Sequence, residues 1–165
     1  MRIGPRFNIQ CAPIITLSGD ILPWLNEIRY LGVYIVSYRY FKCSLEYAKR
    51  SFYRSANAIF GKIGRLASEE VVLELIAKKC LPVLLYGLEA CVLNVTQKRS
   101  LNFPFSRFLM KLFNTFDMHI ISDVMYYFDL RDPSEMLDHR RLKFAYKYSN
   151  DINILCKLCS VCIGS

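Results

Sequence analysis

The chain has 165 residues, of which 53% are hydrophobic and 22% are charged, a composition typical of folded domains rather than of disordered segments. Its 22 Lys and Arg residues outnumber its 14 Asp and Glu residues, and the net charge of +8 favours a polyanionic partner. The longest uncharged apolar run near the middle, residues 81–88, is far shorter than the roughly 20 residues of a membrane-spanning helix, so we expect no membrane partner.

The N-terminal residues do not resemble a secretory signal, because Pro5 and Arg6 stand where an apolar segment should begin. We therefore expect an intracellular chain that is not secreted, with nucleus and cytoplasm both left open. The seven cysteines are then expected to be reduced thiols rather than a disulfide framework.

Positive charge is concentrated in the first part of the chain. Residues 1–66 carry ten basic and three acidic side chains, a net charge of +7, whereas residues 67–165 carry a net charge of only +1. The predicted contact surface for a polyanion therefore belongs to the first 66 residues.

Residues 2–36 are dense in Val, Ile, Tyr and Leu and follow no helical period, which predicts β structure. The clearest strand covers residues 28–36. The residues expected to face a core are Leu31, Val33 and Ile35, and those expected on the opposite face are Tyr30 and Tyr34. Gly32 would lie inside this strand, where glycine marks a bulge, the close approach of another backbone, or a simple kink.

From Ser44 onward the apolar residues recur every three or four positions, which predicts an amphipathic helix capped by Ser44. Its apolar stripe consists of Leu45, Ala48, Phe52, Ala56, Ile59 and Ile63. Basic residues fall on the opposite side, at Arg50, Arg54, Lys62 and Arg65. This basic face is either a solvated surface or a surface that contacts phosphates, and the pattern alone leaves both interpretations open.

Further helices are expected at residues 69–81, 83–93, 97–115 and 134–148. Their predicted N-caps are Ser68, Thr96 and Asp132, since these side chains can accept from free backbone N–H groups in a first turn. Pro82 and Pro104 are expected to kink or end the helices in which they fall, because proline removes a backbone donor.

Catalytic signatures are scarce. The two histidines, His119 and His139, lie in no metal-ligand motif, no glycine-rich phosphate loop is present, and no two Asp residues are adjacent. Cys156, Cys159 and Cys162 near the C-terminus have a spacing found in zinc sites, but a fourth ligand is missing nearby. We interpret these cysteines as an incomplete half-site or an accidental Cys-rich tail, and expect no bound metal.

Several segments form an ordered string: residues 2–6 (RIGPR), 28–35 (IRYLGVYI), the single positions Lys49, Phe52, Asn57 and Ile59, then 67–69 (ASE), 79–87 (KCLPVLLYG) and 89–90 (EA). In this order they resemble the reverse transcriptase of non-LTR retrotransposons of the long-interspersed, jockey and chicken-repeat type. The resemblance covers residues 1–115. It depends most on the Tyr-Leu-Gly strand and on the Leu-Pro-x-Leu-Leu-Tyr-Gly-x-Glu helix that follows about fifty residues later.

The resemblance implies that Tyr30, Leu31 and Gly32 belong to a primer grip, the β-hairpin that places the 3′ end of the primer. It implies that the following helices form a thumb over the template–primer duplex. The residues expected to contact nucleic acid are Lys49, Arg50, Arg54, Lys62 and Arg65. The uneven charge of the chain agrees with this assignment, because holding any duplex requires cations rather than base contacts.

The expected fold is mainly α, with a small N-terminal β-hairpin or meander and a thumb-like helical bundle. Residues 1–40 would be the palm end with its primer-grip strands, and residues 41–150 the bundle. Residues 151–165 would be a poorly ordered Cys-rich tail.

Enzymes of this family hold Mg²⁺ with palm carboxylates, an Ala-Asp-Asp motif and an earlier Asp, which lie upstream of the primer grip. We therefore expect a fragment of an RNA-directed DNA polymerase without a cofactor of its own, inactive alone and lacking palm and fingers as natural packing partners. Residual template–primer binding is the expected remnant function. The alternatives are a small stand-alone basic nucleic-acid-binding protein, or an interaction domain whose basic face is only solvated.

Overall fold

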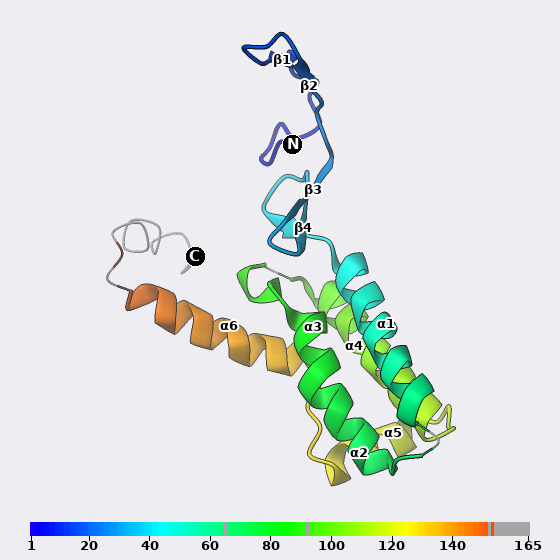
Figure 1. Ribbon diagram of the computed structural model, residues 1–165. Helices are drawn as coiled ribbons and strands as arrows, with labels where there is room; N and C mark the ends of the chain where they lie inside the picture. Colours follow the sequence, from blue (N-terminus) through cyan, green and yellow to red (C-terminus); the bar gives the residue numbers. More distant parts are fainter. Residues whose placement is uncertain (65, 92, 152, 154–165) are drawn as a thin grey trace.

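The computed structural model describes residues 1–64, 66–91, 93–151 and 153. As expected, these residues form a mainly α fold with a small antiparallel β region at the N-terminus. Figure 1 shows the strands in blue and cyan extending from one end of the helical bundle.

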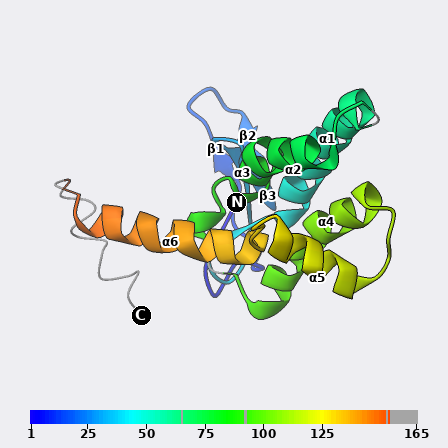
Figure 2. The same cartoon turned by 90° about the horizontal axis from the view of Figure 1, so that it is seen from below.

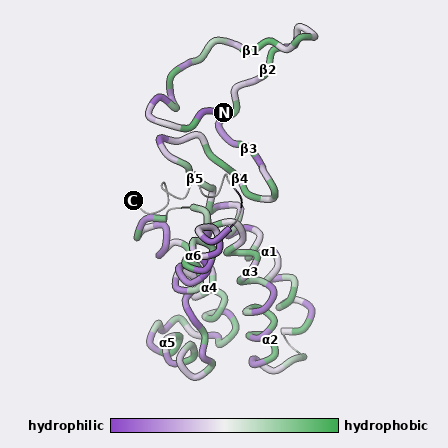
Figure 3. The backbone as a smooth tube through the Cα atoms, turned by 90° about the vertical axis from the view of Figure 1, so that its left-hand side faces the viewer, coloured by the Kyte–Doolittle hydropathy of each residue, from purple (hydrophilic) through white to green (hydrophobic). Residues whose placement is uncertain are grey.

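The β region consists of two small sheets. The strands are β1 (Ile14–Ile15), β2 (Ile21–Leu22), β3 (Glu27–Tyr30), β4 (Val33–Val36) and β5 (Lys42–Cys43). β1 pairs with β2 in the first sheet, and the second has the order β3-β4-β5, with every pair antiparallel. The residues of β1 and β2 are hydrophobic (Figure 3), yet all four are exposed.

The expected single strand over residues 28–36 is wrong, because the chain reverses direction at Leu31 and Gly32. Both residues have positive φ, 47° and 83°, as in the two-residue turns that match the twist of antiparallel strands. Leu31 is consequently 73% exposed at the tip of a hairpin instead of facing a core.

The pairing register of this hairpin determines which side chains lie on each of its two faces. Arg29 is paired with Tyr34, and Tyr30 is paired with Val33. Because neighbouring residues of a strand point to opposite faces, Tyr30 and Tyr34 lie on opposite faces and do not share one as expected. Val33 packs against the buried core, as the sequence predicted.

The predicted amphipathic helix is confirmed as α1 (Leu45–Ile63). Phe52 and Ala56 in its apolar stripe are fully buried, and the remaining stripe residues pack partly against the core. Ser44 is at the N-cap position, although its side chain makes no capping hydrogen bond.

The second helical segment continues past Pro82. It consists of α2 (Glu69–Leu75), a π-helical turn (Ile76–Cys80) and α3 (Leu81–Leu85). The wider turn lets the Leu81 N–H donate to the Ile76 carbonyl, five residues earlier, directly before the proline that has no N–H to donate.

The expected helix over residues 83–93 is wrong, since α3 ends at Leu85 and Gly87 adopts a left-handed φ of 71°. A short 3₁₀ turn, Leu88–Ala90, follows. The left-handed conformation cannot continue a right-handed helix, so the chain bends here.

The last three helices are α4 (Val95–Leu112), α5 (Met118–Tyr127) and α6 (Pro133–Ser149). Asn94, not Thr96, caps α4: its side chain accepts from the Gln97 N–H at 2.8 Å, and the Gln97 side chain accepts from the Asn94 N–H at 3.0 Å. Pro104 lies inside α4 without splitting it. α6 confirms the predicted helix at 134–148, and its C-terminal half extends away from the bundle (Figure 2).

The core lies between α1, the segment from α2 to α3, and α4. Its largest fully buried side chains include Phe52, Phe105, Ile76, Leu81, Leu84, Leu85, Leu101 and Leu109. Among the described residues, no helix has the length and hydrophobicity needed to span a membrane.

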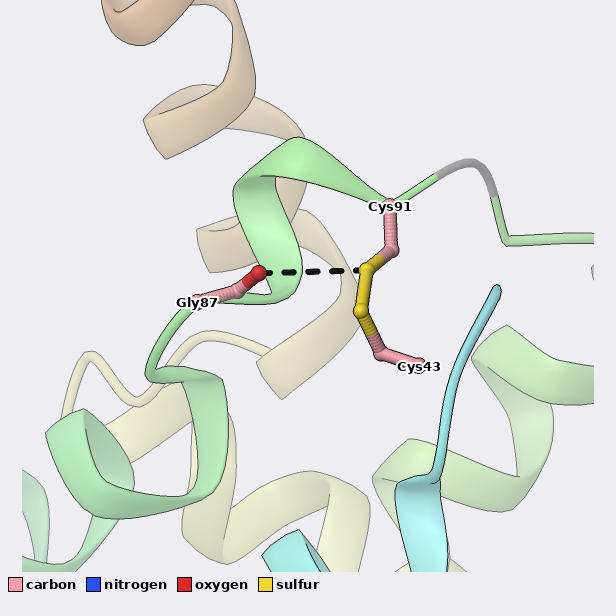
Figure 4. The surroundings of a disulfide bond; sticks show 3 residues. All are labelled: Cys43, Gly87 and Cys91. Carbon is pink, nitrogen blue, oxygen red and sulfur yellow. Dashed lines mark hydrogen bonds between the residues drawn. A yellow bond between two sulfur atoms is a disulfide. The ribbon is translucent and has the colours of Figure 1, made fainter. Parts of the chain in front are cut away.

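A disulfide joins Cys43 in β5 to Cys91, which follows the 3₁₀ turn (Figure 4). The expectation that all cysteines are reduced is therefore wrong for this pair, in which the Cα atoms are 6.4 Å apart and both side chains are buried. Cys11 and Cys80 are free thiols. The predicted half-site at Cys156, Cys159 and Cys162 lies outside the described residues.

Candidate nucleic-acid interface

A groove with a volume of about 570 Å³ lies between the β3–β4 hairpin, the first half of α1 and the end of α3. Its cations are Arg29 from β3 and Arg50 and Arg54 from α1, and no acidic side chain lines it. Arg50 and Arg54 are one helical turn apart, about 6 Å along the axis. We call this surface, with Tyr34, Tyr47 and Tyr86, the basic groove.

Two tyrosines connect the hairpin to α1 inside the basic groove. The rings of Tyr34 in β4 and Tyr47 in α1 stack with centroids 3.6 Å apart and planes within 6°. The guanidinium carbon of Arg29 lies 5.8 Å from the Tyr34 ring centroid, and that of Arg50 lies 5.7 Å from the Tyr47 centroid. These cation–π contacts orient two arginines while leaving their positive charge unneutralised.

A carboxylate lies next to the stacked tyrosines, because Glu27 at the start of β3 is hydrogen-bonded to the Tyr47 side chain. The Glu27 carboxylate near Tyr47 raises the pKa of the Tyr47 hydroxyl, burial raises it further, and Arg50 acts in the opposite direction. The Tyr47 hydroxyl therefore keeps its proton, which it donates to the Glu27 carboxylate. Within the described part of the chain, none of the groove arginines forms an ion pair.

The groove exists because the hairpin packs closely on the bend after α3. A Cβ atom on Gly87 would lie 2.3 Å from Cγ2 of Val33, so only glycine permits this approach. A Cβ atom on Gly32, at the hairpin tip, would lie 3.4 Å from the Tyr86 ring. The Cys43–Cys91 disulfide holds the same junction between strands and helices.

Three of the residues predicted from the sequence meet in the basic groove: Gly32, Arg50 and Arg54. Tyr30 and Leu31 do not line it. They line a second cavity, on the face of the hairpin that also carries Val33 and Ile35.

The other predicted cations lie elsewhere. The Lys49 ammonium donates to Ser100 Oγ and lies 3.8 Å from a Glu46 oxygen, and only 19% of its side chain is exposed. Lys49 therefore stabilises the packing of α1 on α4. Lys62 is in the last turn of α1, about 18 Å along the helix axis from Arg50, and Arg65 is outside the described residues.

Arg29, Tyr34 and Tyr47 are groove residues that the sequence-based assignment missed. The Arg29–Tyr34 contact depends on the register of a hairpin that was expected to be one strand. Tyr47 could have been found, because it precedes Arg50 by three residues and such pairs are neighbours on a helix surface.

Magnesium, which the family resemblance implies for the parent enzymes, does not fit this site. The groove is lined by arginines rather than by the oxygen ligands that Mg²⁺ requires. No three His, Cys, Asp or Glu residues of the described chain gather into a metal-ligand group.

The chain matches no protein-family model, no curated protein and no solved structure.

Proposed function

We propose that the basic groove binds the phosphodiester backbone of a nucleic-acid duplex. The observation that carries this proposal is the gathering of Arg29, Arg50 and Arg54 in one groove, where none of the three forms an ion pair in the described chain although the Glu27 carboxylate lies nearby, beside Tyr47. Guanidinium groups present several N–H donors in a planar array that fits phosphate oxygens, and each neutralised phosphate releases condensed counterions.

The stacked Tyr34–Tyr47 pair favours contact with the nucleic-acid backbone over recognition of bases. Tyr34 and Tyr47 already stack on each other, and arginines lie over them, so the pair offers little free ring surface to a base. Backbone contacts position a duplex without selecting its sequence, which suits a protein that must hold any template and primer.

On this basis we assign the chain to the primer-grip and thumb part of a non-LTR retrotransposon reverse transcriptase, retaining template–primer binding but no polymerase chemistry. The packing of Gly32 on Tyr86 and of Val33 on Gly87 supports the assignment, because it joins the two segments on which the resemblance depends most. Such a protein would act inside the cell, in the nucleus or the cytoplasm.

The exposed apolar residues of the N-terminal region favour an additional protein partner. Six examples are Ile14, Ile15, Leu17, Ile21, Leu22 and Trp24, each between 44% and 111% exposed. In the proposed setting, the palm and fingers of the polymerase would cover them. A stand-alone basic nucleic-acid-binding protein would use the same groove without this partner.

The test compares two variants with the same change in charge. Arg50→Gln/Arg54→Gln removes two groove cations, and Arg131→Gln/Lys143→Gln removes two exposed cations elsewhere. With fluorescence anisotropy on a labelled primer–template duplex at about 0.1 M salt, loss of two phosphate contacts should weaken binding about 60-fold. The control should bind within a few-fold of wild type. Equal losses in both variants would show that only net charge matters.

A further inference from the structure

Glu89 carries a carboxylate that has no partner in the described chain. It lies in the 3₁₀ turn Leu88–Ala90 and is only partly exposed. Its Oε2 atom is closed off from solvent and accepts no hydrogen bond, and neither oxygen takes part in an ion pair. An oxygen of this kind normally has a donor, and because Oε2 is closed to a water-sized group, a ligand can reach the Glu89 carboxylate only through Oε1.

Glu89 borders the second cavity, which has a volume of about 270 Å³. Three aromatic residues line it: Tyr30 (62% exposed), Phe41 (44%) and Tyr86 (58%). Aliphatic side chains, Leu31, Val33 and Ile35, complete the wall, and no basic residue lines the cavity. We call this surface the Glu89 cavity.

The Glu89 cavity and the basic groove lie on opposite sides of one hairpin. Arg29 and Tyr34 face the groove, whereas Tyr30 and Ile35 face the cavity, as the strand register requires. The two sites therefore differ in the sign of their charge, because cations line the groove whereas one carboxylate and aromatic rings line the cavity.

A carboxylate beside aromatic rings favours the binding of an organic cation. A partly desolvated carboxylate is stabilised by a positive partner that also donates hydrogen bonds, and the faces of aromatic rings attract cations through their quadrupole. A divalent metal ion is a poor fit, because one carboxylate supplies too few oxygen ligands. The cavity volume of about 270 Å³ is well above what a single water molecule needs and leaves room for a short alkyl chain.

We propose that the Glu89 cavity binds a primary ammonium or guanidinium group on a short alkyl chain, with Glu89 as its counter-ion. The group can belong to a free amine or to a lysine or arginine side chain of a peptide. The Glu89 cavity uses none of the groove arginines, although Val33 and Tyr86 contribute to the linings of both sites.

Titration calorimetry and chemical-shift mapping with n-butylammonium and n-butylguanidinium test the proposal, with 1-butanol as the neutral probe of matched size. Both cations should bind at least tenfold more tightly than butanol and shift the resonances of Tyr30 and Tyr86. Equal binding of butanol and the cations would overturn the proposal, since it would show a merely apolar pocket.

Two variants separate the role of charge from that of folding. Glu89→Gln keeps the shape of the side chain and should weaken cation binding at least tenfold while leaving butanol binding unchanged. Phe41→Leu keeps an apolar wall without a π face and should weaken cation binding roughly two- to fivefold. Unchanged cation affinity in a folded Glu89→Gln variant, checked by circular dichroism, would overturn the proposal.

Two further arms identify the source of the cation and the independence of the site. The peptide probes are short peptides with capped ends in which one Lys or Arg is the sole charged residue. They should bind more tightly than the free amines if the natural ligand is a peptide, and more weakly if it is a small amine. Arg50→Gln/Arg54→Gln should bind n-butylammonium as wild type does. Loss of amine binding in that variant would contradict a separate site.

Discussion

Replacing Gly87 with alanine should lower the free energy of unfolding by roughly 2–5 kcal/mol. Gly87 has φ of 71°, a left-handed conformation that costs an L-residue with a side chain roughly 1–2 kcal/mol. The added Cβ atom would also lie 2.3 Å from Cγ2 of Val33, and forcing extra volume into packed surroundings typically costs about 1–3 kcal/mol. Either Val33 or the whole hairpin must then move away from the bend.

Urea denaturation followed by far-UV circular dichroism measures this effect, with Gly61→Ala as the matched control. Gly61 lies in α1, and a Cβ atom added there would meet no neighbouring atom within 4 Å, so alanine should stabilise the protein by about 0.5–1 kcal/mol. Adding Val33→Ala to Gly87→Ala should recover part of the loss, because it removes the overlapping methyl group. A Gly87→Ala variant within about 0.5 kcal/mol of wild type would refute the reasoning.

Three other predictions follow from the cysteines and from the chemistry of the chain. Reducing the Cys43–Cys91 disulfide, which spans 48 residues, should lower the free energy of unfolding by about 4 kcal/mol; identical urea curves with and without dithiothreitol would contradict this. Burial raises the pKa of the Cys80 thiol above its ordinary value of 9.0, so the unfolded state loses this proton first and stability should fall as pH rises above about 9. Cys80→Ala should lose less stability over that range, and parallel pH profiles would contradict this. The purified chain should incorporate no nucleotide on primed templates with Mg²⁺ or Mn²⁺, because its sequence contains no adjacent Asp pair to hold two metal ions; metal-dependent extension abolished by a substitution within the chain would show otherwise.

The long amphipathic helices were predictable because burial imposes a visible period on the sequence. α1 has one apolar stripe, and α6 begins with Asp132 and Pro133, a common helix start. α5 was missed, since most of Met118–Tyr127 is apolar and no clear polar face marks a helical period. The Leu31–Gly32 turn was also missed, because leucine gives no local indication that it will adopt a positive φ.

The candidate site could be predicted only where one helix supplies it. Arg50 and Arg54 are four residues apart, so their common face follows from helical geometry. The contribution of Arg29 depends on hairpin register, and the pairing of Cys43 with Cys91 depends on tertiary contacts that cysteine spacing does not determine. Lys49 was expected to contact nucleic acid, but its ammonium donates to Ser100 of α4 and its side chain is largely buried.

The salt dependence of duplex binding tests the central claim most directly. Binding to duplex DNA is measured at several salt concentrations, and log Kobs is plotted against the logarithm of the salt concentration. Each phosphate neutralised contributes about 0.9 to the magnitude of the slope. The wild-type slope should therefore be steeper by about 1.8 than the slope of Arg50→Gln/Arg54→Gln, which lacks two phosphate contacts. The control Arg131→Gln/Lys143→Gln should keep the wild-type slope. Equal slopes for wild type and the groove variant would contradict the account, because they would show that Arg50 and Arg54 do not contact phosphates.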